Sequence, residues 1–308
     1  DMIKSPIFPE AEMQVTIENN RQQFLVNSTK VDVMARKEFS RALFGKNHPC
    51  GRHAVLEDYE CLTTEHLKDF YHRYYHSGNC SIFLSGNITE MIIHQVKDEL
   101  GSSPWGSMHP CEPLSPLPMP DYEGRRIILE HPTAVQSSLR LGCPLVDRAH
   151  PDFAALKVLV TVLGGYFGSR LMSNIREEKG YTYGINASIA SFPFQGYLAI
   201  GSETDNEYVE PCIREVKYEM RRLQEELIPE QELSMVKNYM IGEMCRNYED
   251  PFSLSDAWIF VKTAGLENNF FQTLAEKIRR VKAEELRDLA FRYFQSENMI
   301  EVVAGKKM

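Results

Sequence analysis

The chain has 308 residues, which makes two domains of ordinary size the natural expectation. Its hydrophobic share of 43% and charged share of 25% are typical of a folded globular protein rather than a disordered one. With 34 Lys and Arg against 43 Asp and Glu, the net charge of −9 repels phosphate backbones and anionic lipids, so neither nucleic acid nor a membrane is expected as a partner.

The compartment is indicated only by the cysteines and by the absence of a long apolar stretch. Residues 153–163 are interrupted by Lys157 and fall well short of the roughly 20 residues that a membrane-spanning helix needs. The 7 cysteines are scattered and form no C-x-x-C pair, so we expect them to be reduced. This favours a cytoplasmic protein, with a periplasmic location as the alternative.

The first predicted elements in the chain belong to a sequence that occurs twice. A helix start at Pro9 recurs at Pro229, each followed by acidic residues. Residues 65–86 align without a gap on residues 284–305, and both copies predict an amphipathic helix followed by a strand, at 80–85 and 299–304. The identical residues are Glu65, Leu67, Asp69, Arg73, Tyr74, Ser77, Asn79 and Gly86, repeated as Glu284, Leu286, Asp288, Arg292, Tyr293, Ser296, Asn298 and Gly305. These repeats indicate that the chain contains a duplicated domain.

A proline-rich stretch separates the two copies. We expect residues 1–103 to form the C-terminal half of a first domain, residues 104–123 a linker, and residues 124–308 a complete second domain. If the first copy were as long as the second, which starts near Arg125, roughly ninety residues would precede Asp1. We therefore expect the first domain to be truncated at its N-terminus.

The second copy mixes strands and helices in a pattern that predicts an α+β fold. Strands are expected at 125–130, 137–143, 181–189 and 196–202, and helices at 151–163, 169–179, 206–227 and 229–247, followed by two shorter helices and the closing helix and strand. Locally paired strands indicate a duplicated two-domain layered fold, each domain an antiparallel-rich sheet with helices packed on one face.

Two motifs in the second copy carry a family resemblance. LGGYFGSRL at 163–171 and IREEKGYTYG at 175–184, together with Phe8-Pro9-Glu10, Cys50-Gly51-Arg52 and residues 79–86, closely resemble the pitrilysin (insulinase) family of zinc peptidases. The resemblance covers essentially the whole chain. Within the family, the chain most resembles non-catalytic subunits of bacterial proteins that are similar to the mitochondrial processing peptidase. In that family two homologous domains or chains close around a peptide. The first supplies an H-x-x-E-H zinc helix and a later Glu ligand, and the second supplies an Arg and a Tyr seven residues apart.

Arg176 and Tyr183 match the spacing of that pair, so the resemblance implies that they bind substrate. A tetrahedral intermediate places negative charge on the former carbonyl oxygen, to which a phenol or a guanidinium can donate. The simpler interpretation makes Arg176 one charge on a solvated helix face and Tyr183 an ordinary strand aromatic. Gly180 and Gly184, which frame the turn between them, favour the functional interpretation.

The metal site is where the sequence departs from the family. No H-x-x-E-H motif occurs in the chain. The position of the third ligand holds Gln23, and that of the supporting Glu holds Thr16. An amide is a poor zinc ligand compared with a carboxylate. We therefore expect no metal and no catalytic residue in this chain, and zinc in a partner subunit.

Two other clusters have simple structural interpretations. His72 and His76 are spaced to hold a metal on one helix, but their counterparts Phe291 and Gln295 favour packing and a helix end. Gly164, Gly165 and Gly168 lie between two predicted helices, which indicates a tight corner rather than a phosphate-binding loop.

The leading hypothesis is a non-catalytic, substrate-binding subunit or domain of a zinc metallopeptidase. It would pair, as a hetero- or homodimer, with a homologous zinc-binding subunit and offer Arg176 and Tyr183 to a peptide substrate. One alternative is a structural or interaction protein of the same fold, as in the core subunits of respiratory complexes. Another is the C-terminal remnant of an active zinc peptidase, which Gln23 disfavours.

Overall fold

The structure, a computed structural model, describes residues 2–107, 115–117 and 124–306. Most of the predicted linker 104–123 therefore lies outside the described residues. The chain divides into two compact units, which we call unit 1 (residues 1–28, 54–115 and 248–260) and unit 2 (residues 29–53, 116–247 and 261–308). These units differ from the predicted division at 103 and 124, since residues 29–53 group with the second copy and residues 248–260 with the first.

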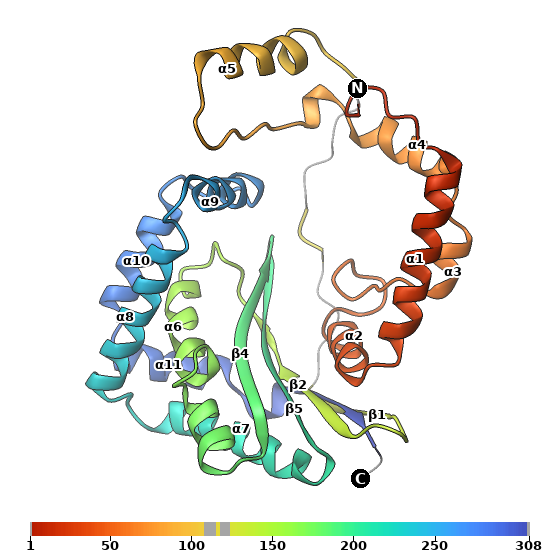
Figure 1. The fold of residues 1–308 in the computed structure, drawn as a ribbon. Helices are drawn as coiled ribbons and strands as arrows, with labels where there is room; N and C mark the ends of the chain where they lie inside the picture. The colour runs from red at the N-terminus through yellow and green to blue at the C-terminus, as the bar shows by residue number, and fades with distance from the viewer. Residues whose placement is uncertain (1, 108–114, 118–123, 307–308) are drawn as a thin grey trace. The chain divides into compact units, whose positions relative to one another are not determined.

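Unit 1 is helical, and most of it lies in the red to yellow part of the ribbon, which also contains residues 29–53 of unit 2 (Figure 1). The Phe24 and Tyr59 rings, 5.6 Å apart, join its first two helices. The Tyr71 hydroxyl donates to the carbonyl of Ile3 at 2.7 Å and ties the N-terminal segment to a third helix. Its helices are α1 (Glu10–Ser28), α3 (Leu56–Glu60), α4 (Thr64–Tyr74), α5 (Glu90–Val96), the short turns η1 (Ser77–Asn79) and η2 (Lys97–Gly101), and the first part of α9 (Pro251–Thr263).

The strand predicted at residues 80–85 is wrong. These residues are extended at Cys80, but they pair with no strand among the described residues. A strand forms only where a neighbour satisfies its backbone N–H and C=O groups. Unit 1 offers no such neighbour in its described part, and Ile82 and Leu84 are exposed as a result.

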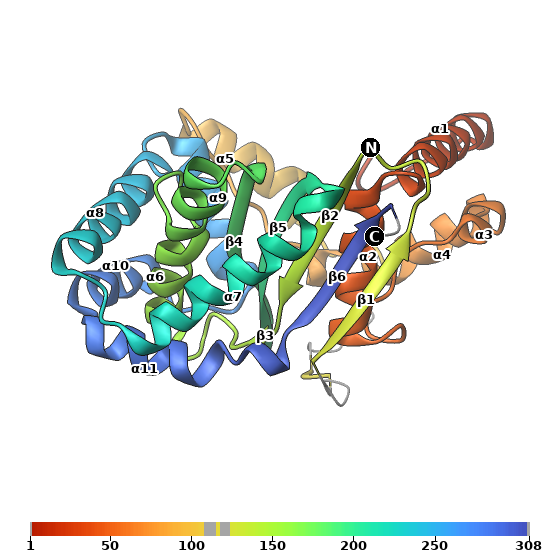
Figure 2. The same cartoon turned by 90° about the horizontal axis from the view of Figure 1, so that it is seen from below.

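Unit 2 is built on one six-stranded sheet with the order β1-β6-β2-β5-β3, and β4 pairs with β5 (Figure 2). Only β1 and β6 run parallel, and the other pairs are antiparallel. This confirms the predicted α+β class and its antiparallel-rich sheet. The strands are β1 (Arg125–Glu130), β2 (Gln136–Gly142), β3 (Pro144–Leu145), β4 (Thr182–Phe192), β5 (Gln195–Asp205) and β6 (Ile300–Gly305).

The main core of unit 2 lies between one face of the sheet and five helices. Leu139 of β2 and Leu198 of β5 point into it, and they meet the apolar side of α6, where ten of twelve residues are buried. Apolar burial of this extent is the main stabilising contribution to such a fold. The helices are α6 (Phe153–Gly164), α7 (Val209–Glu225), α8 (Glu230–Arg246), α10 (Phe270–Arg280) and α11 (Ala283–Tyr293).

The opposite face of this sheet is also partly covered, contrary to the prediction that helices lie on one face only. Helix α2 (Val31–Phe44) packs there, and Figure 2 shows it beside β6 and β1. Its buried Ala35 and Phe39 form a second apolar cluster with Ile300 and Val302 of β6. Covering these apolar side chains removes them from water, which explains why residues 29–53 belong to unit 2.

The repeated helix is present in both units. Helices α4 and α11 have 11 residues each and keep the register of the sequence duplication, and each is followed by a three-residue 3₁₀ turn, η1 or η5 (Ser296–Asn298). Burial of the matching side chains differs sharply. Phe294 is 0% exposed, whereas its counterpart Tyr75 is 50% exposed. The second copy therefore buries a face that the first copy leaves open.

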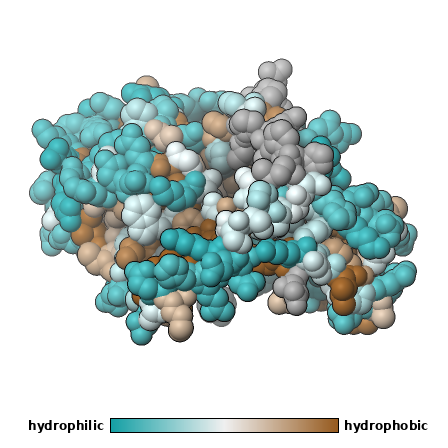
Figure 3. Space-filling model, turned by 90° about the horizontal axis from the view of Figure 1, so that it is seen from above, coloured by the Kyte–Doolittle hydropathy of each residue, from teal (hydrophilic) through white to brown (hydrophobic). Residues whose placement is uncertain are grey.

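The polarity of the surface and of the helices limits how the chain can meet a membrane. The face shown in Figure 3 is mostly hydrophilic, with hydrophobic residues in scattered groups. Among the helices of the described part, none combines the length and the hydropathy that crossing a bilayer would require.

The cysteines differ in burial, and burial predicts the reactivity of their thiols. Burial raises the pKa of both Cys143 and Cys212 to about 12, so neither forms the reactive thiolate near neutral pH. Cys61, Cys80 and Cys245 are exposed. We expect iodoacetamide at pH 8 to alkylate these three in the folded protein and to spare Cys143 and Cys212, as measured by peptide mass spectrometry. Urea-unfolded protein is the control, and rapid native labelling of Cys143 would contradict the burial.

Candidate substrate-binding site

The segment that carries Arg176 is η3 (Met172–Glu178), a π-helical turn within the helix predicted at 169–179. Its inner side is fixed to α7, because the buried Asn174 amide donates to Glu215 at 3.1 Å and to Glu219 at 2.7 Å. Just before it, the Arg170 guanidinium forms two hydrogen bonds of 2.9 Å to Glu232 of α8. Such bonds between charged groups are strong and directional, so they hold η3 in one position.

A polar cavity of about 650 Å³ lies behind η3, between α7 and α8. Six of the eight charged side chains that line it form ion pairs: Arg170 with Glu232, Lys179 with Glu215 at 3.4 Å, and Arg222 with Glu219 at 3.3 Å. A network of opposite charges of this kind is a structural support for the segment, so we assign it no substrate.

Arg176 itself lies on the outer side of η3. Its guanidinium carbon is 4.5 Å from the centre of the Phe167 ring, which is 64% exposed. A cation over an exposed aromatic ring gains about 0.5–1 kcal/mol, enough to favour one orientation of the side chain. The Arg176 side chain makes no ion pair or hydrogen bond with any described residue. Its donors are therefore available to a ligand.

Tyr183 follows a sharp turn and a break in the sheet. Gly180 has a φ of 66°, a left-handed conformation that glycine adopts without a steric penalty. Strand β4 then contains a bulge, since Thr182 pairs with Thr204 while Ile185 already pairs with Ser202. A bulge places two residues opposite one and redirects a side chain. Tyr183 is 91% exposed as a result.

The bulge also decides which face of the sheet Tyr183 occupies. Ile185 points into the main core, and the Thr182 hydroxyl is bonded to that of Ser202 at 3.0 Å on the same side. Tyr183 and Gly184 together stand opposite Glu203, whose side chain is exposed on the other face. Tyr183 therefore lies on the face of β4 and β5 that does not meet α6.

The structure thus places the two predicted residues at the two ends of one rigid turn. Arg176 is at the end of η3 and Tyr183 at the start of β4, and the N–H of Tyr181 bonds the carbonyl of Ile175 at 3.0 Å within the turn. No hydrogen bond or cation–π contact joins the Arg176 and Tyr183 side chains. The ring of Phe167 under Arg176 was not predicted, although an exposed aromatic inside a glycine-rich corner is a visible signal in the sequence.

The positions tested for zinc do not fit a metal. Gln23 lies exposed on α1, where its amide donates to Asn27 at 3.1 Å. Thr16 donates to the carbonyl of Glu12 at 2.9 Å. Within residues 2–107, 115–117 and 124–306, His, Cys, Asp and Glu side chains form no cluster of three or more that could hold a metal ion.

The two secondary motifs have structural roles. Helix α4 ends at Tyr74, so His76 lies past the helix end and is buried, while His72 is exposed on the helix. The two rings are not on one helical face. Gly164 and Gly165 stand at the end of α6. Glycine is needed there because a Cβ would clash with Ala187 at position 164 and with Thr161 at position 165.

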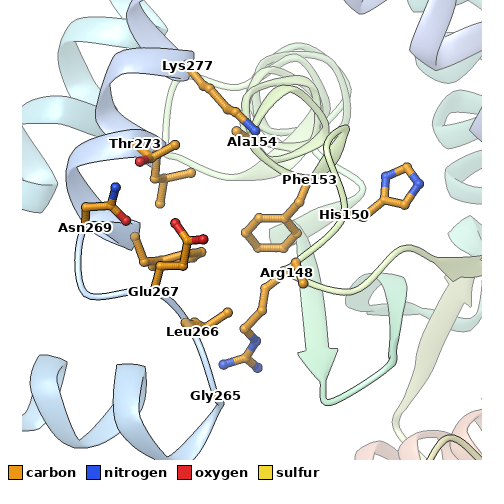
Figure 4. A pocket seen from close by; sticks show the side chains of 13 residues that line it. Arg148, His150, Phe153, Ala154, Gly265, Leu266, Glu267, Asn269, Thr273 and Lys277 are labelled. Carbon is orange, nitrogen blue, oxygen red and sulfur yellow. The ribbon is translucent and has the colours of Figure 1, made fainter.

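A separate cavity of about 320 Å³ lies in unit 2 between the start of α6, the loop before α10, and α10 itself (Figure 4). Phe153 extends into it, Lys277 and Glu267 approach it from α10 and the loop, and His150 points away. Arg148, at its edge, donates to the hydroxyl of Ser191. The lining mixes apolar side chains with three charged ones, Arg148, Glu267 and Lys277, so we assign this cavity no role in the site.

Comparison with known proteins agrees with this geometry. Residues 62–240, more than half of the chain, match the family model described as Peptidase M16 inactive domain. The chain belongs to the peptidase M16 family. This confirms the resemblance to pitrilysin-type zinc peptidases and to their inactive domains.

Two curated relatives of this M16 chain carry different descriptions. It is 24% identical over 317 residues to a protein of Helicobacter pylori named "Non-peptidase homolog YmxG", covering 100% of this chain and 71% of that protein. It is 25% identical over 253 residues to "Uncharacterized zinc protease YmxG" of Bacillus subtilis, covering 81% of this chain and 60% of that protein. The chain thus spans only about 60–71% of the length of these relatives.

Solved structures show the same fold. The peptidase M16 inactive domain from Pseudomonas fluorescens superimposes with a TM-score of 0.86 at 22% identity, covering 99% of this chain and 73% of that one. A chain of "Complex III2 from Candida albicans" gives a TM-score of 0.74 at 15% identity, covering 94% of this chain and 70% of that one. At these identities the agreement concerns the fold alone.

Proposed function

We propose that this M16 chain is a non-catalytic, substrate-binding subunit or domain that offers Arg176 and Tyr183 to a peptide held at the zinc site of a homologous partner. The observation that carries the proposal is the pair of unengaged donors on one rigid turn, an arginine supported by Phe167 and a tyrosine that is 91% exposed. Side chains that only stabilised the fold would be buried or bonded to neighbours.

The chemistry of the two groups suits peptide hydrolysis. A guanidinium can hold a peptide carbonyl or carboxylate through two parallel hydrogen bonds. A phenol can donate to the oxygen that becomes negative as water adds to the peptide carbonyl. Zinc in the partner would activate that water, and this chain contributes only the two donors.

Among the described residues no set of donors fits a metal ion, and this supports a non-catalytic role for the chain beside a zinc-binding partner. Gln23 is neutral, exposed and bonded to Asn27, so it offers no anionic donor where the third ligand of a zinc peptidase would stand. The match to an inactive-domain model agrees with a chain that does not hydrolyse peptides by itself.

Reconstitution with a zinc-bearing M16 chain from the same organism tests the proposal. We expect this chain alone to show no peptide cleavage, and the mixture to cleave an internally quenched peptide at least tenfold faster than the partner alone. A partner that is equally active with and without this chain would contradict the proposal. It would then favour a structural or interaction role for the same fold. Cleavage by this chain alone, with bound zinc, would instead favour an active peptidase.

A further inference from the structure

The face of the sheet that carries Tyr183 holds a second arginine, Arg140 of β2. In the register of the sheet, Arg140 stands opposite Gly201 of β5, and Gly201 stands opposite Asn186 of β4. The three residues form one row across three strands. Gly142, two residues after Arg140 and on the same face of β2, lies against the Phe39 ring of α2. The row therefore begins where α2 stops covering this face of the sheet.

The side chain of Arg140 lies flat across β5. A Cβ at Gly201 would overlap Nη1 of Arg140 and would meet Oδ1 of Asn186 at 3.4 Å. Only glycine leaves room at this point for the guanidinium. The sequence thus places a residue without a side chain under the arginine head group, next to an exposed amide.

Arg140 has no acidic partner in the part of the chain that the structure describes. Its Nε is buried without a hydrogen bond, and none of the ion pairs includes it. Glu203, two pairs further along β5, stands opposite Ser138 and forms no ion pair with Arg140, and Glu301 of β6, opposite Leu141, is paired with Lys217. A partly buried guanidinium without a counter-ion is unfavourable, and a bound anion would relieve this.

The row is within reach of a peptide that contacts Tyr183. Arg140 lies two strands away from β4, and Tyr183 is two pairs along β4 from the level of Arg140. These spacings give about 12 Å between the Cα atoms of Arg140 and Tyr183. An extended peptide covers that distance in three to four residues.

We propose that Arg140, with Asn186 beside it, forms a carboxylate-binding subsite that selects peptides carrying an acidic group three to four residues from the carbonyl held by Tyr183. This inference rests on the proposed function, because it needs a peptide at Tyr183. The carboxylate can come from an Asp or Glu side chain or from the peptide C-terminus, and both present the same planar pair of oxygens to a guanidinium.

The test uses fluorescein-labelled ten-residue peptides that bind this chain, with a single Glu moved through the sequence and Gln at the same position as the reference. Each peptide is made with a free and with an amidated C-terminus, and Kd is measured by fluorescence anisotropy. We expect wild type to prefer the carboxylate roughly five- to tenfold at one register. If replacing Glu by Gln removes the preference, the bound carboxylate is that of the Glu side chain. If amidation removes the preference, the bound carboxylate is the peptide C-terminus.

Variants then assign the preference to Arg140. We expect R140Q to bring the ratio to about one while the Kd for the neutral peptide stays within twofold, and R140K to keep about two- to threefold, since an ammonium lacks the planar fork. E203Q should not reduce the preference, because it removes a negative charge. R221Q, an exposed arginine of α7, is the matched control and should leave the ratio unchanged.

The outcomes separate this inference from the proposed function. Equal binding of both peptides by wild type, with Tyr183→Phe weakening both, overturns the subsite and leaves the proposed function standing. No peptide binding by wild type overturns both. A preference that persists in R140Q also overturns the subsite. If R140Q fails to fold, as judged by circular dichroism, the R140K variant is used in its place. An undiminished preference in R140K then contradicts recognition of the carboxylate by the Arg140 guanidinium.

Discussion

Changing Tyr183 to Phe in the reconstituted pair is expected to lower kcat for peptide cleavage by about 10²-fold, with little change in KM. Removing one donor to a developing oxyanion typically costs 10²- to 10³-fold in kcat, because that bond strengthens in the transition state. Arg176→Ala is expected to raise KM as well, since a guanidinium that holds a substrate carbonyl acts in the ground state too. Steady-state kinetics with an internally quenched peptide measure both effects.

Matched controls for this experiment exist on α7. Tyr218 is 51% exposed and Arg221 is exposed, and both lie on a helix that packs against the other face of the sheet. Tyr218→Phe and Arg221→Ala should leave kcat and KM within twofold of wild type. If Arg176→Ala and Tyr183→Phe behaved like these controls, the two residues would have no part in cleavage and a purely structural role would be favoured.

Phe294→Ala is expected to destabilise unit 2 by about 3–5 kcal/mol, the usual cost of removing a large side chain from a core. Phe294 is 0% exposed, and the carbonyl of the same residue accepts from Gln224 at 2.6 Å, so the surrounding residues cannot easily close the cavity. Hydrogen exchange of the β5 amides measures the opening free energy of this unit by itself.

The duplication provides the control for this substitution. Tyr75 occupies the corresponding place after α4 and is 50% exposed. Tyr75→Ala should cost about 1 kcal/mol or less, because little apolar area leaves contact. Equal losses at Phe294 and Tyr75 would show that the burial of the two copies does not differ in solution.

Local patterns predicted most of unit 2, and the failures have identifiable causes. Strand β1 was predicted with its observed ends, and α6, α7 and α8 within three residues, because their apolar periodicity is strong. The strand at 80–85 failed because strand formation depends on a partner that the residues themselves do not encode.

Part of the candidate site carries a local sequence signal. The spacing of Arg176 and Tyr183 and the glycines of the turn are sequence signals, and the structure shows both side chains without competing partners. The bulge that exposes Tyr183 was not predicted, since it depends on how β4 aligns with β5. Arg140 was missed because only the register of three strands brings it next to Gly201 and Asn186.

The position of α2 has a consequence for anyone who wishes to cut this protein into pieces. A fragment made by cleaving between residues 103 and 124 would lose α2 and would expose Ile300, Val302 and Ala304 along a bare sheet surface. Such a surface favours self-association in water. The C-terminal half is therefore not an autonomous module, and a well-behaved fragment would have to carry residues 29–53 along with it.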